Sequence, residues 1–140
     1  MSGKPPHQLS PSEIRDLIPF AAELGIELLE AGPECVRGTL EWAPNRTTTA
    51  EVMHGGAIMT LADTCGAVCA FLNLPPDARG TATIESKTNF MRAVQSGSAL
   101  ATSRPLHKGR TLIVLETEVV RDDGKLAAKV TQTQIYHYDR

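Results

Sequence analysis

The hydrophobic positions of this chain follow two different periods, one typical of a helix and one typical of strands. Between Gly55 and Leu72 nearly every residue is apolar or small, and this run stops before Pro75-Pro76. A run of this length that ends ahead of a proline pair predicts one long helix. Because the helix would be apolar almost all round, we expect it to be buried on most of its sides.

Strand signals occupy most of the remaining chain. Gly25–Glu30 and Cys35–Trp42 are strand-like, and Gly32-Pro33 between them favours a hairpin. Turns are expected at Lys108-Gly109 and at Asp122-Asp123-Gly124. Alternating polar and β-branched residues predict four more strands after the helix: Gly80–Ala93, Ser98–Leu106, Thr111–Arg121 and Leu126–Tyr138.

The N-terminal part predicts a short helix behind a tail. Residues 1–9 carry no pattern and are expected to form a flexible tail ahead of a single domain over residues 10–140. Ser10 suits an N-cap, Pro11 the first helical position and Glu13 the third position of a capping box. Pro19 should end or kink this helix.

The order of elements predicts an α+β fold. A short helix, two strands, one long helix and four strands are best arranged as an antiparallel sheet of about six strands wrapped around the long central helix. One sheet covers only part of such a helix. We therefore expect a second subunit to cover the rest.

Composition narrows the class of protein. The 140 residues suit one domain, and the formal net charge of −2 gives no electrostatic indication of a nucleic-acid partner. No apolar run approaches the ~20 residues that cross a membrane, and the N-terminus lacks the apolar core of a signal peptide. Three cysteines, an odd number without framework spacing, fit a reducing compartment. We expect a cytoplasmic protein.

The start of the long helix carries the candidate chemistry. Asp63 is the one acid in the apolar stretch, and an acid there is costly to bury unless it is paired or reactive. Gly55 and Gly56 begin the helix and leave backbone N–H groups open to a polarised carbonyl. His54 precedes them, but it lies ~13–14 Å from Asp63 along the helix axis. If they cooperate, each meets its counterpart in a second chain across a two-fold axis.

Each of these residues also has a purely structural interpretation. Asp63 could be an acid paired with Thr, Lys or Arg, and His54 could cap the helix or pack in the loop. The Gly-Gly pair could simply allow the helix to pack closely on the sheet. The sequence alone leaves these alternatives open.

The segment His54–Ala70 resembles the central-helix motif of the hotdog-fold acyl-CoA thioesterases, and is most similar to the phenylacetic acid degradation thioesterase group. That pattern is His-Gly-Gly followed by Leu-Ala-Asp or Leu-Ala-Glu, with the acid nine residues after the His. The matching positions are His54, Gly55, Gly56, Leu61, Ala62 and Asp63. A second stretch, Arg104–Arg110, resembles the strand–turn segment of the family that contacts the nucleotide end of coenzyme A.

The resemblance implies roles for individual residues. Asp63 would be the nucleophile or general base, Gly55 would supply the oxyanion N–H, and His54 would help to place the thioester. Thr83, with Thr81 as second choice, would assist the acid or the water from the strand after the helix. Members often have Asn or Gln six residues before the His, where this chain has Thr48.

The two parts of the substrate would bind in different places, the coenzyme A at a basic turn and the acyl group in an apolar pocket. A Gly turn with basic neighbours offers charge and backbone donors to the coenzyme A phosphates; the candidates are His107, Lys108, Gly109, Arg110 and Arg92. Apolar side chains around the helix would line the acyl pocket, namely Met53, Ile58, Met59, Phe71 and Phe90. No Cys and His set has zinc spacing, so we expect no metal and no cofactor.

The sequence therefore predicts a thioester hydrolase that acts on a small-to-medium acyl-CoA or aryl-CoA. A homodimer would be the smallest active unit, and the resemblance implies a homotetramer. No nucleic-acid or membrane partner is expected. Two alternatives remain: a non-catalytic hotdog module that binds acyl-CoA, which would not need Asp63, and a hotdog dehydratase, which would pair an acid with a histidine.

Overall fold

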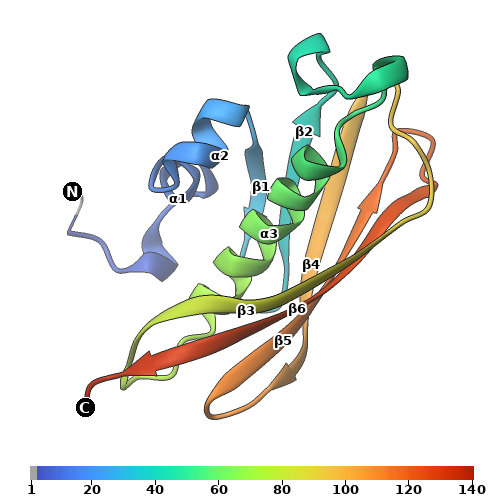
Figure 1. Cartoon of the computed structure of the whole chain (residues 1–140). Helices are drawn as coiled ribbons and strands as arrows, with labels where there is room; N and C mark the ends of the chain where they lie inside the picture. The colour runs from blue at the N-terminus through green and yellow to red at the C-terminus, as the bar shows by residue number, and fades with distance from the viewer. Residues whose placement is uncertain (1–2) are drawn as a thin grey trace.

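A computed structural model describes residues 3–140 and contains one antiparallel sheet around a central helix (Figure 1). The strands follow the order β1-β2-β4-β5-β6-β3. Their bounds are β1 Glu27–Ala31, β2 Val36–Glu41, β3 Ala78–Phe90, β4 Ser98–Lys108, β5 Leu112–Val120 and β6 Leu126–Tyr138. The helices are α1 Pro11–Asp16, α2 Pro19–Leu24 and α3 Gly55–Leu72, with 3-10 turns η1 Pro6–Gln8, η2 Pro44–Arg46 and η3 Thr49–Glu51.

The predicted fold class is confirmed by this arrangement. The sheet curves around α3, and α1 and α2 lie beside β1 (Figure 1). The central helix has the predicted bounds, and each predicted strand is present with ends that shift by a few residues. β4 continues past Pro105, whose missing N–H is accommodated by a shift in register between Pro105 and His107.

The N-terminal helices begin and end where local sequence signals predict. The Ser10 side chain accepts from the Glu13 N–H, and the Glu13 carboxylate accepts from the Ser10 N–H at 2.8 Å, which completes the predicted capping box. Pro19 does end the first helix, and it also begins a second one, α2. Of the expected tail, residues 1 and 2 lie outside the described residues, whereas residues 3–9 include η1, and Leu9 packs against the core.

The core is built on α3. Leu61, Ala62 and Cys65 have no exposed surface, and they pack with residues such as Leu40 and Leu115 from the sheet. Contrary to the expectation from the sequence, α3 is long and apolar enough to cross a membrane by length and composition alone. The core helices of many proteins share this property, and the inward face of α3 is buried against the strands. The helix therefore organises the interior of the domain.

One stripe of α3 and one edge of the sheet stay open. β3 pairs only with β6, so its outer edge presents unpaired backbone groups along a 13-residue strand. Beside it, Met59 of α3 is 41% exposed and Phe71 is 36% exposed, while Ile84 of β3 is 58% exposed. This confirms that a single sheet covers only part of the apolar helix.

The thiols of α3 give a test of this core. Burial raises the pKa of the Cys65 thiol to about 12 and that of Cys69 to about 11. Because the thiolate is the reactive form, we predict that neither thiol of the native protein reacts appreciably with an aromatic disulfide reagent at pH 8. Spectrophotometric titration should count all three cysteines only after unfolding in guanidinium.

A Cys35→Ser variant serves as the control, since Cys35 is also buried but lies outside α3. If that variant still showed rapid reaction of a thiol in the native state, the close packing of α3 against the sheet would be contradicted.

Candidate active site

Asp63 is held by two side chains from the sheet. Its Oδ1 accepts from Thr83 Oγ1 at 3.2 Å and from Gln132 Nε2 at 2.7 Å. Within residues 3–140, Oδ2 accepts no hydrogen bond from a side chain or a backbone N–H. The carboxylate lies on the open stripe of α3, so one oxygen is fixed and the other faces outward.

The strands bring these groups together from distant parts of the sequence. β3 and β6 are neighbours, and Thr83 of β3 lies directly opposite Gln134 of β6. The register shifts between Thr83 and Glu85, which marks a local irregularity of β3 beside the acid. Thr83, proposed from the sequence, therefore contacts Asp63, whereas Thr81 contacts Gln134 instead.

The N-terminus of α3 presents an open donor. His54 Nδ1 accepts from the Gly56 N–H at 2.8 Å, and the His54 carbonyl accepts from Ala57 and Ile58. The Gly55 N–H has no acceptor among the residues that the structure describes. His54 therefore acts as the N-cap, one of the roles that the sequence left open, and the Gly55 N–H is available to a substrate oxygen.

A cavity of about 320 Å³ lies beside this donor. It brings together six residues that the sequence proposed for different roles, in the order Thr48, Met53, Gly55, Ile58, Phe90 and Arg92. The Phe90 ring lies against Gly55, where an added Cβ would be 3.1 Å from its Cζ. The Phe90 ring therefore forms the wall of the cavity next to Gly55.

A second cavity, of about 270 Å³, adjoins the Asp63 side of the helix. Ala67 and Phe71 continue the helix face that carries Asp63, and Thr81 continues the strand face that carries Thr83. The opposite wall comes from the N-terminal region, including Ile14 and Ile18. Sequence reasoning did not anticipate that wall, because nothing in the pattern places α1 against α3.

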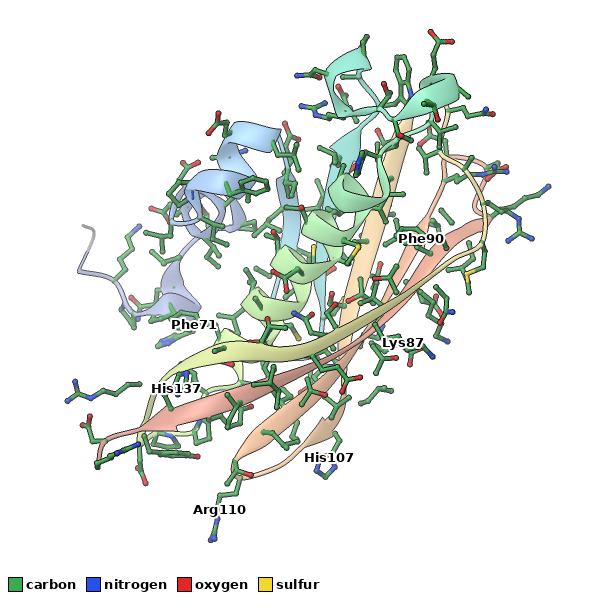
Figure 2. All side chains as sticks on the ribbon, viewed as in Figure 1. Phe71, Lys87, Phe90, His107, Arg110 and His137 are labelled. Carbon is green, nitrogen blue, oxygen red and sulfur yellow. The ribbon has the colours of Figure 1, made fainter. Side chains whose placement is uncertain are left out.

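The proposed coenzyme A residues do not form one cluster in a protomer. His107 and Arg110 lie exposed at the β4–β5 turn, at the other end of the molecule from Phe90 (Figure 2). Lys108 makes an ion pair of 2.8 Å with Glu34, and the Gly109 N–H donates to the Leu112 carbonyl.

Arg92 lies away from that turn. It lines the cavity next to Gly55, and its guanidinium donates to the Leu126 carbonyl at 2.9 Å. The turn and Arg92 are therefore separate basic positions in one protomer.

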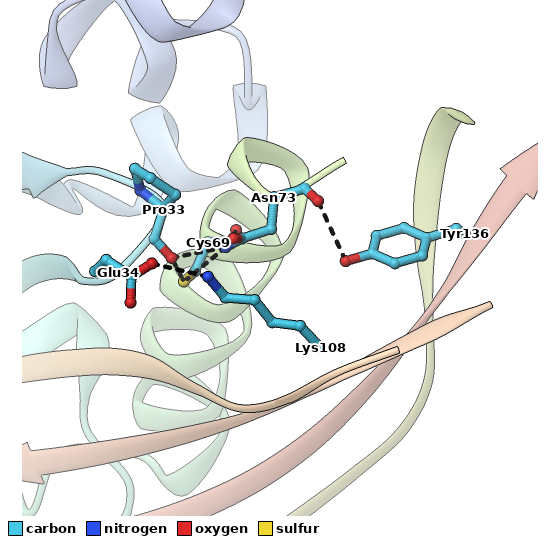
Figure 3. Close-up of polar contacts among 6 residues, drawn as sticks. All are labelled: Pro33, Glu34, Cys69, Asn73, Lys108 and Tyr136. Carbon is cyan, nitrogen blue, oxygen red and sulfur yellow. Dashed lines mark hydrogen bonds and ion pairs between the residues drawn. The ribbon is translucent and has the colours of Figure 1, made fainter. Parts of the chain in front are cut away.

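The basic turn is anchored to the C-terminal end of α3. The Asn73 amide donates to the Pro33 carbonyl at 2.7 Å and to the Cys69 carbonyl at 2.8 Å, so it joins the end of the helix to the β1–β2 turn (Figure 3). Lys108 and Glu34 meet beside this junction (Figure 3). The turn therefore has a fixed place relative to the helix.

Gly55 and Asp63 cannot act together within one protomer. They are eight residues apart on one helix, which separates them by ~12 Å along its axis. No group of three or more His, Cys, Asp or Glu side chains in residues 3–140 is arranged to bind a metal ion. Within one protomer, the Asp63 carboxylate and the Gly55 N–H are therefore two separate groups.

The sequence analysis missed Gln132 and Gln134. Both side chains point inward from β6, where alternate positions such as Val130 and Tyr136 are buried as a strand pattern predicts. Two successive glutamines at inward positions break that pattern. This interruption was the available signal, because a buried amide requires a polar partner.

Comparison with known proteins agrees with the fold. Residues 50–128 match the family model described as the Thioesterase superfamily. A Mycobacterium tuberculosis protein named "Putative esterase Rv1847" is 28% identical over 122 residues, which is 86% of this chain and 87% of that protein. A Deinococcus radiodurans protein named "Putative esterase" is 34% identical over 111 residues, 78% of this chain and 73% of its own length.

Solved structures share the whole architecture. The structure of the Mycobacterium tuberculosis protein superposes with a TM-score of 0.84 at 26% identity and covers 88% of this chain and 99% of that one. The Haemophilus influenzae thioesterase HI1161 has a TM-score of 0.86 at 22% identity, with 94% and 92% covered. The Thermus thermophilus phenylacetic acid degradation protein PaaI has a TM-score of 0.76 at 23% identity, with 85% and 98% covered.

The family match spans more than half of the chain, and the Deinococcus radiodurans relative is matched over most of its length. Both agree with the sheet and central helix described above. This chain therefore belongs to the Thioesterase superfamily and has its hotdog fold.

Proposed function

We propose that the protein is an acyl-CoA thioesterase, which hydrolyses a small-to-medium acyl- or aryl-CoA to the free acid and coenzyme A. Membership of the Thioesterase superfamily supports hydrolysis of a thioester. The observation that carries the proposal is the Asp63 carboxylate, which lies on an apolar helix with Oδ1 held by two donors and Oδ2 open. The free oxygen belongs to an exposed side chain on the open stripe of the helix, where a substrate can reach it.

The geometry allows two routes for the same acid. In the first route Asp63 Oδ2 removes a proton from water, and the water oxygen bonds to the thioester carbon. In the second route Oδ2 itself bonds to that carbon, loss of the thiolate gives an anhydride, and water then hydrolyses the anhydride to the free acid and the Asp63 carboxylate. In either route negative charge develops on the carbonyl oxygen, where the Gly55 N–H at the positive end of α3 stabilises it. The C–S bond then breaks, and coenzyme A leaves as a thiolate that takes up a proton. No cofactor is required.

A second copy of the chain completes the site in this proposal. Pairing the open edges of two β3 strands across a two-fold axis sets two α3 helices antiparallel and covers the open stripe that includes Met59 and Asp63. The Gly55 N–H of one protomer then faces the Asp63 of its partner. Each dimer has two such sites, and a homotetramer would be two of these dimers.

The two cavities suggest how the substrate is arranged. The one further along the helix face that carries Asp63 is lined almost entirely by apolar groups, including Phe71, and suits the acyl group. The one beside Gly55 has Met53, Ile58 and Phe90 together with Arg92, and suits the part of the substrate near the thioester. The exposed turn with His107 and Arg110 is then available to the phosphates of coenzyme A.

The two alternative functions fit the site less well. A non-catalytic acyl-CoA module has no use for an acid with a free oxygen on the open stripe of the helix. A dehydratase needs an acid and a histidine at one carbon atom; His54 Nδ1 caps α3, which leaves only its Nε2 for that role. Formation of an enoyl product without a free thiol would favour the dehydratase.

Replacement of Asp63 tests the proposed hydrolysis. Asp63→Asn keeps the size of the side chain but removes the base and nucleophile, so we expect kcat to fall by at least ~10²-fold. Release of free coenzyme A from a panel of short, long and aromatic acyl-CoAs, followed with a thiol reagent, measures this. Asp77→Asn, which neutralises an exposed acid beyond α3, is the matched control and should keep wild-type kcat.

Wild-type turnover by Asp63→Asn would show that the acid is structural. Binding of acyl-CoA without any release by the wild-type protein would instead indicate the non-catalytic module.

Replacement of Arg110 tests the coenzyme A position. Arg110→Ala removes an exposed charge at the β4–β5 turn, so we expect KM for acyl-CoA to rise by about fivefold or more, with kcat nearly unchanged. Steady-state kinetics on the best substrate of the panel gives both constants. Arg79→Ala, an exposed arginine paired with Asp139, should leave KM unchanged. Equal KM values for Arg110→Ala and wild type would remove Arg110 from the binding site.

A further inference from the structure

Two buried glutamines of β6 lie behind Asp63. The side chain of Gln132 has no exposed surface, and that of Gln134 is 1% exposed. A primary amide carries two donor hydrogens and one acceptor oxygen, and burying it without partners is unfavourable. The hydrogen bonds of these two residues therefore show what the site requires of them.

The two amides fix the direction of the Thr83 hydroxyl. Gln132 Nε2 donates to Thr83 Oγ1 at 3.2 Å, and Gln134 Nε2 donates to the same oxygen at 2.5 Å. A hydroxyl oxygen has two lone pairs and one proton, so two incoming donors use both lone pairs. The Thr83 proton is then directed to Asp63 Oδ1, 3.2 Å away.

The Thr81 hydroxyl bonds the other end of the second amide. It donates to Gln134 Oε1 at 3.0 Å, which places the oxygen of that amide toward Thr81 and its nitrogen toward Thr83. Every hydrogen bond in this chain of side chains therefore points toward the carboxylate.

Gln132 also contacts Asp63 directly, and its own orientation follows from that contact. An ionised carboxylate only accepts, so the amide nitrogen must face Asp63 and the amide oxygen must face away. That oxygen, Oε1, is buried and has no hydrogen-bond partner among the described residues. It lies against Gly66 of α3, where an added Cβ would come within 1.9 Å of it. Glycine at this position therefore leaves room for the amide where it stands, since an added Cβ would displace it from Asp63, and the amide oxygen stays unpaired while its nitrogen remains on Asp63.

We propose that Gln132 is a positioning residue for Asp63, with Gly66 providing its space and Gln134 acting one step behind through Thr83. Both donors meet at Oδ1, which fixes the plane of the carboxylate and leaves Oδ2 as the oxygen that reacts. Such prior orientation lowers the barrier without any movement during the reaction. This inference rests on the proposed hydrolysis at Asp63.

Gln132→Met tests the inference, because it keeps a similar volume in the buried site and removes the donor. We expect kcat to fall by about 10- to 100-fold with KM within about twofold of wild type, since substrate contacts are unchanged. In an Asp63→Asn background, Gln132→Met should lower kcat no further, because Gln132 acts only through that carboxylate. Thr117→Val, which breaks the buried Ser103–Thr117 hydrogen bond, a bond that includes neither Asp63 nor its partners, is the control and should keep kcat.

A second variant keeps the test decisive if Gln132→Met does not fold. Gln132→Glu preserves the shape, but its carboxyl group donates to Asp63 only while protonated, and the neighbouring carboxylate favours that form at acidic pH. The ratio of its kcat to that of wild type should therefore be highest near pH 5 and fall by about tenfold or more toward pH 8.

Three results would overturn the inference. The first is a wild-type kcat in Gln132→Met. The second is a double variant, Gln132→Met with Asp63→Asn, whose fall in kcat equals the product of the falls in the two single variants. The third is a ratio of kcat between Gln132→Glu and wild type that stays constant across the pH range. A wild-type protein that releases no coenzyme A would overturn the proposed hydrolysis as well, so the two failures are distinguishable.

Discussion

The structure depends on burying one helix that is apolar almost all round against one sheet. Most of α3 gains its stability by packing against all six strands and α2, and residues such as Leu61 are completely removed from water. A single curved sheet cannot enclose a helix, so one stripe remains open. The same constraint leaves β3 as a free edge beside that stripe. In the proposed dimer, a second copy of the chain covers both.

The site occupies the places where this packing is incomplete. Asp63 stands on the open stripe, where its charge keeps contact with solvent on one side and with donors of the sheet on the other. The N-terminus of α3 is capped by His54 in a way that satisfies Gly56 but not Gly55. Since both groups belong to one rigid helix, ~12 Å apart along its axis, the fold that creates them also keeps them apart within one protomer.

Much of the fold could be predicted from the sequence, because periodicity and end signals act locally. Gly55–Leu72 was predicted with its observed bounds, and the capping box at Ser10 follows from three residues. The contact between Asp63 and Thr83 was anticipated through family resemblance. The role of Gln132 was not, because it depends on the register between β3 and β6 and on the space left by a glycine one turn along α3, which are properties of the assembled sheet.

Complementation between two inactive variants tests the central claim, a site shared by two protomers. Gly55→Pro removes the open N–H at the first helical position, where proline is tolerated, and Gly55→Ala is the control that keeps the N–H. Gly55→Pro and Asp63→Asn chains are unfolded together, refolded as a mixture and assayed. A shared site predicts recovery to about a quarter of wild-type activity, since half of the dimers are mixed and each has one intact site. Activity no greater than that of the separate variants would contradict the account.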